Sequence, residues 1–478
     1  MATLIEQHPL YDTLPVGQDV IFTVSNTSVV SSYTNVKFIA EVHISADQPP
    51  NPSTTTDIVG TFKTTPNNTG VGMFDFRPII ESFVSADNLA RKDSAYKTVT
   101  NTVGTNVPIH LINKFSGNLN AMRYLFIRFK IEYIDNDSAS STFGDLITTD
   151  ITDSDLYNIF NGYLKYTDVL DLADTPYTQS TGNNFGYPIP QKFTLDQDAG
   201  EFLSNAPTTQ YANINDYGTL AFLAISTIPS KIRLVYYDST GSQIGTESAD
   251  FTSGSNYITP SDANRRLFYF GCFPANLRNW STAFNALVTA GTIQGGYYTV
   301  EPLNSASANF GTKYTFNVNC SNLKGYEPIR LCWLNQWGAW DYYTFNMKST
   351  KMISTKGSTY QQLEGSWNES AYRLDSFKGG KKAFRVNATE KISMNTDFVS
   401  EAESEWFEEL INSPEVYILK GFQDDLNSAS LNISALNQYV TPVRLTTSSY
   451  TKKTVANDKL MQYTFEVEKS KTLRTQAV

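Results

Sequence analysis

Side chains able to do acid-base or nucleophilic chemistry are few and scattered in this chain. The three histidines, His8, His43 and His110, all lie within the first 110 residues. A serine or cysteine triad would need one of them as its base, and no Gly-x-Ser-x-Gly elbow is present. His43 alternates with Val42 and Ile44 on an expected strand, so its ring is predicted to face solvent or a partner.

Metal and cofactor motifs are also missing from the sequence. Asp150, Asp153 and Asp155 are closely spaced, but the turn glycine and distal glutamate of a calcium loop are absent. The stretch Thr149–Leu164 is instead predicted to be a short helix capped by Asp153 or Ser154. No zinc spacing, Walker loop or dinucleotide fingerprint occurs. We therefore expect no catalytic residue, no cofactor and no metal.

Asp341 is the carboxylate with the most suggestive neighbours, Trp340 and Tyr342. Glycoside hydrolysis needs only a pair of suitably placed carboxylates, so a polysaccharide depolymerase is one alternative function. An aspartate in an aromatic strand next to a turn is more often a turn or edge residue. We expect a protein that is not an enzyme.

The most specific feature is an aromatic hairpin over Arg330–Asn346, with three tryptophans, two tyrosines and a phenylalanine. Both faces of its strands are largely apolar, which predicts a core or a seam between modules rather than a sugar platform or a subunit interface. Its tip, Gln336–Gly338, is expected to anchor another protein chain. The candidate interface residues are Gln336, Trp337, Gly338, Trp340 and Tyr342.

Composition limits the classes of partner. Charged residues make up 18% of the chain, the net charge is −10 and the pI is about 5.0, which disfavours nucleic acid. The best basic stretch, Lys378–Arg385, is expected to be an exposed hairpin loop. Cys272, Cys320 and Cys332 are predicted to be unpaired buried thiols made in a reducing cytoplasm. With neither a signal peptide nor an 18-residue apolar run, neither secretion by a standard signal nor membrane insertion is expected.

Hydrophobic periodicity predicts a mainly β protein of several β-sandwich-like modules with a few short helices. Period-two alternation marks strands over 35–45, 58–64, 122–134, 231–238 and 296–303, among others. Helices are expected after Pro78, over 149–164, near 280–289 and over 400–413. The last has Ser400 and Glu403 in capping-box positions and ends before Pro414.

The length of 478 residues exceeds what one hydrophobic core normally serves, so three modules are predicted. They are residues 1–172, a β module with a covering helix; 173–303, a middle β module; and 304–478, which contains the aromatic hairpin and the helix near 400–413. The Gly, Asn and Pro-rich stretch Thr175–Gln191 is the expected linker.

Three groups of segments resemble virion structural proteins of tailed bacteriophages, especially marine and Bacteroidetes-infecting phages. The first comprises Leu14–Ser25, Val36–Ser45 and Phe62–Glu81; the second is Ile329–Phe345; the third is Ser448–Glu468, preceded by the Trp406 helix. The middle third of the chain is not covered. The resemblance implies a non-enzymatic building block of the tail, baseplate or neck, and it assigns no catalytic residue.

We therefore expect a structural component that assembles in multiple copies through aromatic-rich interfaces. Its expected partners are copies of itself and other phage structural proteins, with the host surface as a further candidate, and neither nucleic-acid binding nor membrane insertion is expected. Its expected location is the virion, after synthesis in the host cytoplasm. The alternatives are a module that binds a host receptor or glycan through Trp337, Trp340 and Tyr342, and the depolymerase.

Overall fold

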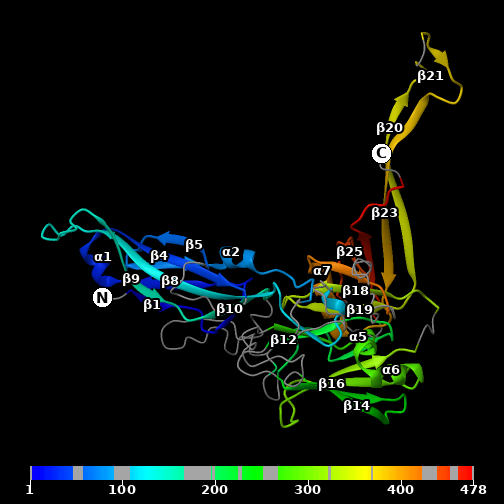
Figure 1. Cartoon of the computed structure of the whole chain (residues 1–478), viewed down its shortest axis with the longest axis horizontal. Coiled ribbons are helices and arrows are strands. Elements are labelled where there is room, and N and C mark those ends of the chain that lie inside the picture. The colour runs from blue at the N-terminus through cyan, green and yellow to red at the C-terminus, as the bar shows by residue number, and fades with distance from the viewer. Residues whose placement is uncertain are drawn as a thin grey trace. The chain divides into compact units, whose positions relative to one another are not determined.

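The computed structural model describes residues 3–46, 57–90, 108–165, 195, 200–223, 229–250, 267–320, 325–367, 370–422, 439–452 and 461–475. Strands account for 48% and helices for 12% of the structure, in several separate sheets, which confirms the predicted mainly β fold (Figure 1). Contacts divide the chain into two units. Unit 1 comprises Met1–Ser321, Leu334–Asp341 and Phe422–Leu436, and unit 2 comprises Asn322–Trp333, Tyr342–Gly421 and Asn437–Val478.

The N-terminal part of unit 1 is a pair of sheets that share one core. One sheet has the order β1 (Leu4–Gln7), β3 (Ile21–Ser25), β6 (Val71–Asp75). The other has the order β2 (Thr13–Pro15), β10 (Tyr157–Phe160), β8 (Met122–Ile134), β4 (Thr34–Ser45), β5 (Ile58–Thr64), with β9 (Leu146–Asp153) also paired to β8. Phe22 of the first sheet lies 5.7 Å from both Phe129 and Tyr157 of the second, ring centre to ring centre. Helix α1 (Thr27–Ser32), helix α2 (Arg77–Ile80) and the 3₁₀ turn η1 (Glu81–Phe83) complete this part.

The rest of unit 1 contains two further sheets. One has the order β11 (Thr209–Ala212), β17 (Tyr314–Val318), β16 (Tyr297–Leu303), β13 (Lys231–Tyr237), β14 (Gln243–Asp250). The other has the order β12 (Thr219–Leu223), β15 (Leu267–Gly271), β7 (Phe115–Gly117), so its last strand comes from a distant part of the sequence. The 3₁₀ turn η3 (Ile109–Leu111) precedes β7, and helices α5 (Pro274–Trp280) and α6 (Thr282–Thr289) follow β15. Phe284 of α6 lies 5.4 Å from Tyr236 of β13.

Unit 2 is built on a seven-stranded sheet. Its order is β19 (Trp340–Phe345), β18 (Ile329–Leu334), β24 (Val416–Leu419), β25 (Val440–Leu445), β26 (Thr464–Lys469), β23 (Gly380–Asn395), β20 (Ser349–Gln362). Two short strands, β21 (Gly365–Ser366) and β22 (Arg373–Leu374), pair with each other between β20 and β23.

Helix α7 (Glu401–Asn412) confirms the predicted C-terminal helix. Ser400 accepts a hydrogen bond from the backbone N–H of Glu403, whose carboxylate in turn accepts one from the N–H of Ser400. This capping box satisfies two donors that a helix N-terminus would otherwise leave unpaired. Trp406 and Phe407 point into the unit, 4.8 Å from Trp333 and Tyr343 respectively. The helix is thereby packed against the aromatic hairpin strands β18 and β19.

The predicted helix over 149–164 is wrong, because this stretch forms strands β9 and β10. Asp153 does not cap a helix; its carboxylate accepts two hydrogen bonds from the guanidinium of Arg128 on β8, at 2.7 and 2.9 Å. Ser154 accepts one from the backbone N–H of Ile127. Pairing with the long strand β8 therefore outweighs the local helix signal.

The predicted module boundary at 303/304 is also wrong. Strand β17 pairs with β16 in antiparallel register, Tyr298 opposite Phe316, so the boundary would cut one sheet in two. The predicted boundary at 172/173 and the linker Thr175–Gln191 lie outside the described residues. Strand pairing therefore sets a later division than the composition predicts.

Candidate interaction surface

The tip of the aromatic hairpin is buried inside unit 1. Trp337 is 3% exposed and its indole N–H donates to the side-chain oxygen of Asn205 at 3.1 Å. The carbonyl of Gln336, which is half-buried, accepts from the N–H of Tyr163 at 2.7 Å. Gly338 has a φ of +72°, and a Cβ added there would lie 2.0 Å from the carbonyl oxygen of Asn161. The tip of the aromatic hairpin therefore packs against residues of its own unit and is not exposed to another chain.

The other two candidate interface residues are buried as well. Trp340 donates its indole N–H to the backbone carbonyl of Asp87 at 2.9 Å and packs edge-on against His110. Tyr342, in unit 2, lies under the guanidinium of Arg330, 5.3 Å from its ring centre. The glycan-binding alternative required Trp337, Trp340 and Tyr342 to be exposed, and their burial removes its motivation.

The prediction that the hairpin strands are buried on both faces is confirmed. Five of the six residues of β18, and five of the six of β19, are buried. Phe345 is 5.7 Å from Phe465 and Tyr343 is 5.0 Å from Phe345. The aromatic residues of this segment form core structure, as their two apolar faces indicate.

Asp341 lies on the edge strand β19, next to the hairpin turn, but it is buried rather than exposed at the surface. One carboxylate oxygen accepts from the hydroxyl of Ser204 at 2.6 Å and from the amide of Asn335 at 3.2 Å. Asn335 in turn accepts from the N–H groups of Trp337 and Ala339, which holds the turn. These contacts give Asp341 a structural task in unit 1.

His43 is buried, at 1% exposure, which corrects the prediction that it faces solvent. Strand β4 lies between β5 and β8, and the ring packs edge-on against Phe126 at 5.4 Å. Both ring nitrogens lack a hydrogen-bond partner among the described residues. Burial, with the nearby Arg128 as second cause, lowers the pKa of His43 below its usual 6.5.

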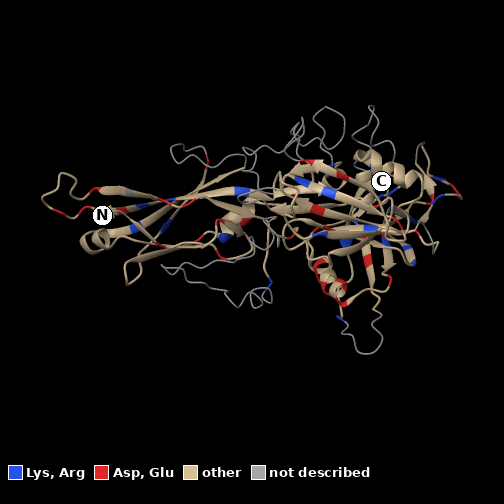
Figure 2. Ribbon diagram, turned by 90° about the horizontal axis from the view of Figure 1, so that it is seen from below, with Lys and Arg blue, Asp and Glu red and all other residues tan. Residues whose placement is uncertain are grey.

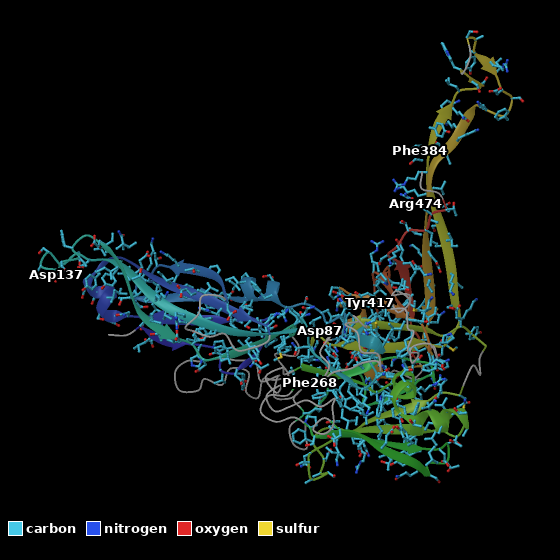
Figure 3. The ribbon with its side chains drawn as sticks, viewed as in Figure 1. Asp87, Asp137, Phe268, Phe384, Tyr417 and Arg474 are labelled. Atoms are coloured by element: carbon cyan, nitrogen blue, oxygen red, sulfur yellow. The ribbon has the colours of Figure 1, made fainter. Side chains whose placement is uncertain are left out.

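A second buried ionisable group, Asp87, joins distant segments of unit 1. One carboxylate oxygen accepts from the backbone N–H groups of Leu119, Asn120 and Ala121, and the other accepts from the hydroxyl of Tyr269 at 3.0 Å (Figure 3). Burial raises the pKa of Asp87 despite these donors. These hydrogen bonds connect residues 119–121 to Tyr269 through Asp87, which indicates a structural role for this carboxylate.

The cysteines are thiols: Cys272 and Cys332 are buried, as predicted, whereas Cys320 is exposed. Burial raises the pKa of Cys332, which keeps it protonated and unreactive. Within the described residues, no group of three or more His, Cys, Asp or Glu side chains is arranged to hold a metal ion.

Lysine and arginine residues are interspersed with acidic residues over the ribbon (Figure 2). Some of them form ion pairs between neighbouring strands, such as Arg233 with Glu301 and Lys130 with Glu41. Helices long and apolar enough to span a bilayer do not occur in the described part of the structure.

The outstanding surface feature is a long hairpin in unit 2, formed by β20 and β23 and here called the arm (residues 349–395). The two strands pair in antiparallel register from Ser349 opposite Met394 to Gln362 opposite Gly380, with one irregularity at Ser358/Thr359. Along β23, strand β26 pairs with Lys391–Asn395, and Leu473 forms a single bridge with Ala388. Beyond these contacts the arm extends from the sheet as two strands (Figure 1).

The far end of the arm is an ordered structure with paired polar groups. Asp375 accepts from the hydroxyl of Ser366 at 2.5 Å and lies 3.3 Å from the ammonium of Lys378. The N–H of Asp375 donates to the carbonyl of Glu364 at 3.0 Å. The Ser366 hydrogen bond, followed by Lys378, lowers the pKa of Asp375. In the described part of the tip of the arm (residues 363–367 and 370–379), Ser366, Asp375 and Lys378 thus pair with one another.

Apolar side chains are on the outside of this tip. Trp367 is 80% exposed and Phe377 is 75% exposed. Leu363 and Leu374 are almost as exposed. Further down, Phe384 projects from β23 (Figure 3) and packs edge-on against Tyr360 at a ring distance of 6.4 Å. Large apolar groups grouped on an exposed surface mark interaction sites.

No family model and no curated protein match this chain. Its function must therefore be argued from its own geometry. The arm presents exposed apolar side chains to a partner, whereas the aromatic hairpin is buried.

The arm was not predicted as an interaction surface. The stretch Lys378–Arg385 is exposed, as expected, but most of it belongs to strand β23 rather than to a loop. Residues 349–362 are mostly Ser, Thr, Lys and Gln, and a strand buried on neither face carries no alternation to detect. The available signal was the isolated Trp367 and Phe377 in an otherwise polar, glycine-bearing segment.

Proposed function

We propose that this chain is a non-enzymatic structural subunit of a tailed-phage particle, in the tail, baseplate or neck, where several copies assemble with neighbouring proteins. The observation that carries the assembly role is the arm, with its exposed apolar tip around Trp367 and Phe377. The resemblance of the N-terminal, hairpin and C-terminal stretches to phage virion proteins supplies the setting.

The arm is expected to be only marginally stable when it is surrounded by solvent. A two-stranded hairpin without a sheet or helix behind it is marginally stable by itself. The described residues of β20 between Thr350 and Gln361 are all exposed, so this strand adds almost no burial of its own. Contact with another protein would bury the aromatic side chains and cover both strands, which makes the arm an assembly element.

The free energy that the tip can contribute to binding follows from its residue types. Burying one large apolar side chain contributes roughly 1.5–3 kcal/mol. Tryptophan is among the commonest hot-spot residues of protein interfaces. The tip carries Trp367, Phe377, Leu363 and Leu374 beside the paired strands β21 and β22, so several large apolar groups can be buried by one partner.

The proposal is tested on particles from infected cells that produce this chain. Antibodies against the purified protein should label the tail, baseplate or neck of purified particles, and quantitative mass spectrometry should find several copies per particle. Absence of the chain from purified particles, with the chain present in the same lysate, would refute the structural role.

A further inference from the structure

We propose that the far part of the arm of one copy, namely the basic residues Lys381–Arg385 of β23 together with the adjoining apolar tip, docks on the outer face of helix α7 in a second copy of this chain. The inference rests on the proposed assembly function and names the two surfaces that meet. It predicts a head-to-tail contact, because the arm and α7 are different surfaces.

Charge complementarity selects this partner. The arm carries eight lysines and arginines and four aspartates and glutamates, in a chain whose net charge is −10. The arm is therefore basic while the remainder of the chain is strongly acidic. Opposite potentials steer encounter and fix orientation between protein surfaces, so arms of identical copies repel one another and attract the rest of the chain.

Helix α7 is the most acidic element that is described. It contains five glutamates and no lysine or arginine. Glu401 and Glu405 are exposed and lie one turn apart on the same side of the helix. Glu403 is engaged in the capping box and Glu408 is paired with Lys452, so Glu401 and Glu405 form the outward acidic pair.

The arm presents a matching set of groups. Lys381, Lys382 and Arg385 are all exposed on β23, next to the aromatic pair Tyr360 and Phe384. On the other copy, Phe398 is exposed three residues before α7 begins. Cationic groups flanked by aromatic rings can thus meet carboxylates flanked by an aromatic ring.

Self-pairing through the open edge of β20 is the less favourable arrangement. Two β20 strands related by a two-fold axis would bring Lys351 and Lys356 of both copies to one short ladder. Lysine on an edge strand disfavours edge-to-edge association. A heterologous contact avoids this repulsion.

The test is a charge exchange followed by sedimentation velocity of the full-length protein. We expect the unaltered chain to self-associate, and the variant Lys381→Glu/Lys382→Glu to bind itself at least about tenfold more weakly. The variant Glu401→Lys/Glu405→Lys should weaken association to a similar extent. An equimolar mixture of the two variants should associate again, because each arm then meets an α7 of opposite charge.

Matched controls separate this contact from general charge or stickiness. Glu81→Lys/Asp155→Lys makes the same charge change on exposed residues of unit 1 and should leave association unchanged. Trp367→Ser/Phe377→Ser should weaken association at least about tenfold, whereas Met73→Ser/Leu146→Ser, which also removes two exposed apolar groups, should not. Circular dichroism verifies that each variant is folded.

Three results would overturn the inference: an unaltered chain that stays monomeric, charge variants that associate normally, or a mixture that fails to recover. Each is distinguishable from failure of the proposed function. A chain that is monomeric in solution but present in purified particles keeps its structural role and docks its arm on a different particle protein.

Discussion

At the scale of single residues, His43 is a histidine held in a site that suits an uncharged side chain. Its ring is buried on β4 against Phe126, and no described group accepts or donates a hydrogen bond at either nitrogen. Protonation in the folded state would place a charge in this site beside Arg128. The folded protein therefore favours neutral His43, while the unfolded chain binds a proton near pH 6.5.

His43 should make the folded protein sensitive to acid. Because its pKa is lowered on folding, its stabilising contribution is present above pH 6.5 and is lost as the pH falls below that value. The slope of the unfolding free energy attributable to this residue reaches at most about 1.4 kcal/mol per pH unit. Urea unfolding of the protein and of His43→Leu between pH 8 and pH 5 measures how much of this pH dependence comes from His43. Identical pH profiles for both proteins would contradict this account.

At the scale of elements, strands that pair with a neighbour on one buried face were predictable from alternation. The predicted ranges of β5 and β8 coincide with the observed Ile58–Thr64 and Met122–Ile134. The stretch 149–164 was not predictable in this way, because its strand state depends on pairing with β8. Likewise, the burial of the hairpin tip depends on Asn161, which lies against Gly338, and on Asn205, which binds Trp337, and both are far away in the sequence.

The turn of the aromatic hairpin offers a test of its close packing. Gly338→Ala should destabilise the protein by at least about 2 kcal/mol, since alanine resists a positive φ and its methyl would meet the Asn161 carbonyl. Gly241→Ala is the matched control, with a φ of +84° and no atom within 4 Å of the added methyl. It should cost only the conformational part, about 1 kcal/mol. Chemical denaturation of both variants measures the difference, and equal losses would refute the close contact.

At the scale of the whole molecule, each unit has a well-packed core, whereas the arm buries almost no side-chain surface. Every described residue between 357 and 386 is exposed or half-buried. The core clusters of both units lie elsewhere, around Phe22 in unit 1 and Phe407 in unit 2. Stability and association should therefore be separable properties of this protein.

Shortening the arm tests that separation. Replacing residues 357–386 with Asn-Gly joins Lys356 to Asn387, which face each other across the strands, through a favoured two-residue turn. The thermal unfolding midpoint should stay unchanged, because the removed residues contribute little burial. Self-association should be lost. A variant that no longer folds, or one that associates as before, would show that the arm is part of the body or irrelevant to assembly.

The division of the hairpin between units sets an order for folding on the ribosome. Residues 334–341 and Phe422 belong to unit 1, where Trp340 contacts Asp87 and His110 and Phe422 stacks against Tyr217. Nascent chains fold progressively from the N-terminus as they emerge. Unit 1 is therefore not complete until Phe422 has been synthesised, so the arm emerges while unit 1 is still unfinished. Helix α7, the proposed receiver, emerges later still, so a growing chain exposes its docking tip before it offers any acceptor.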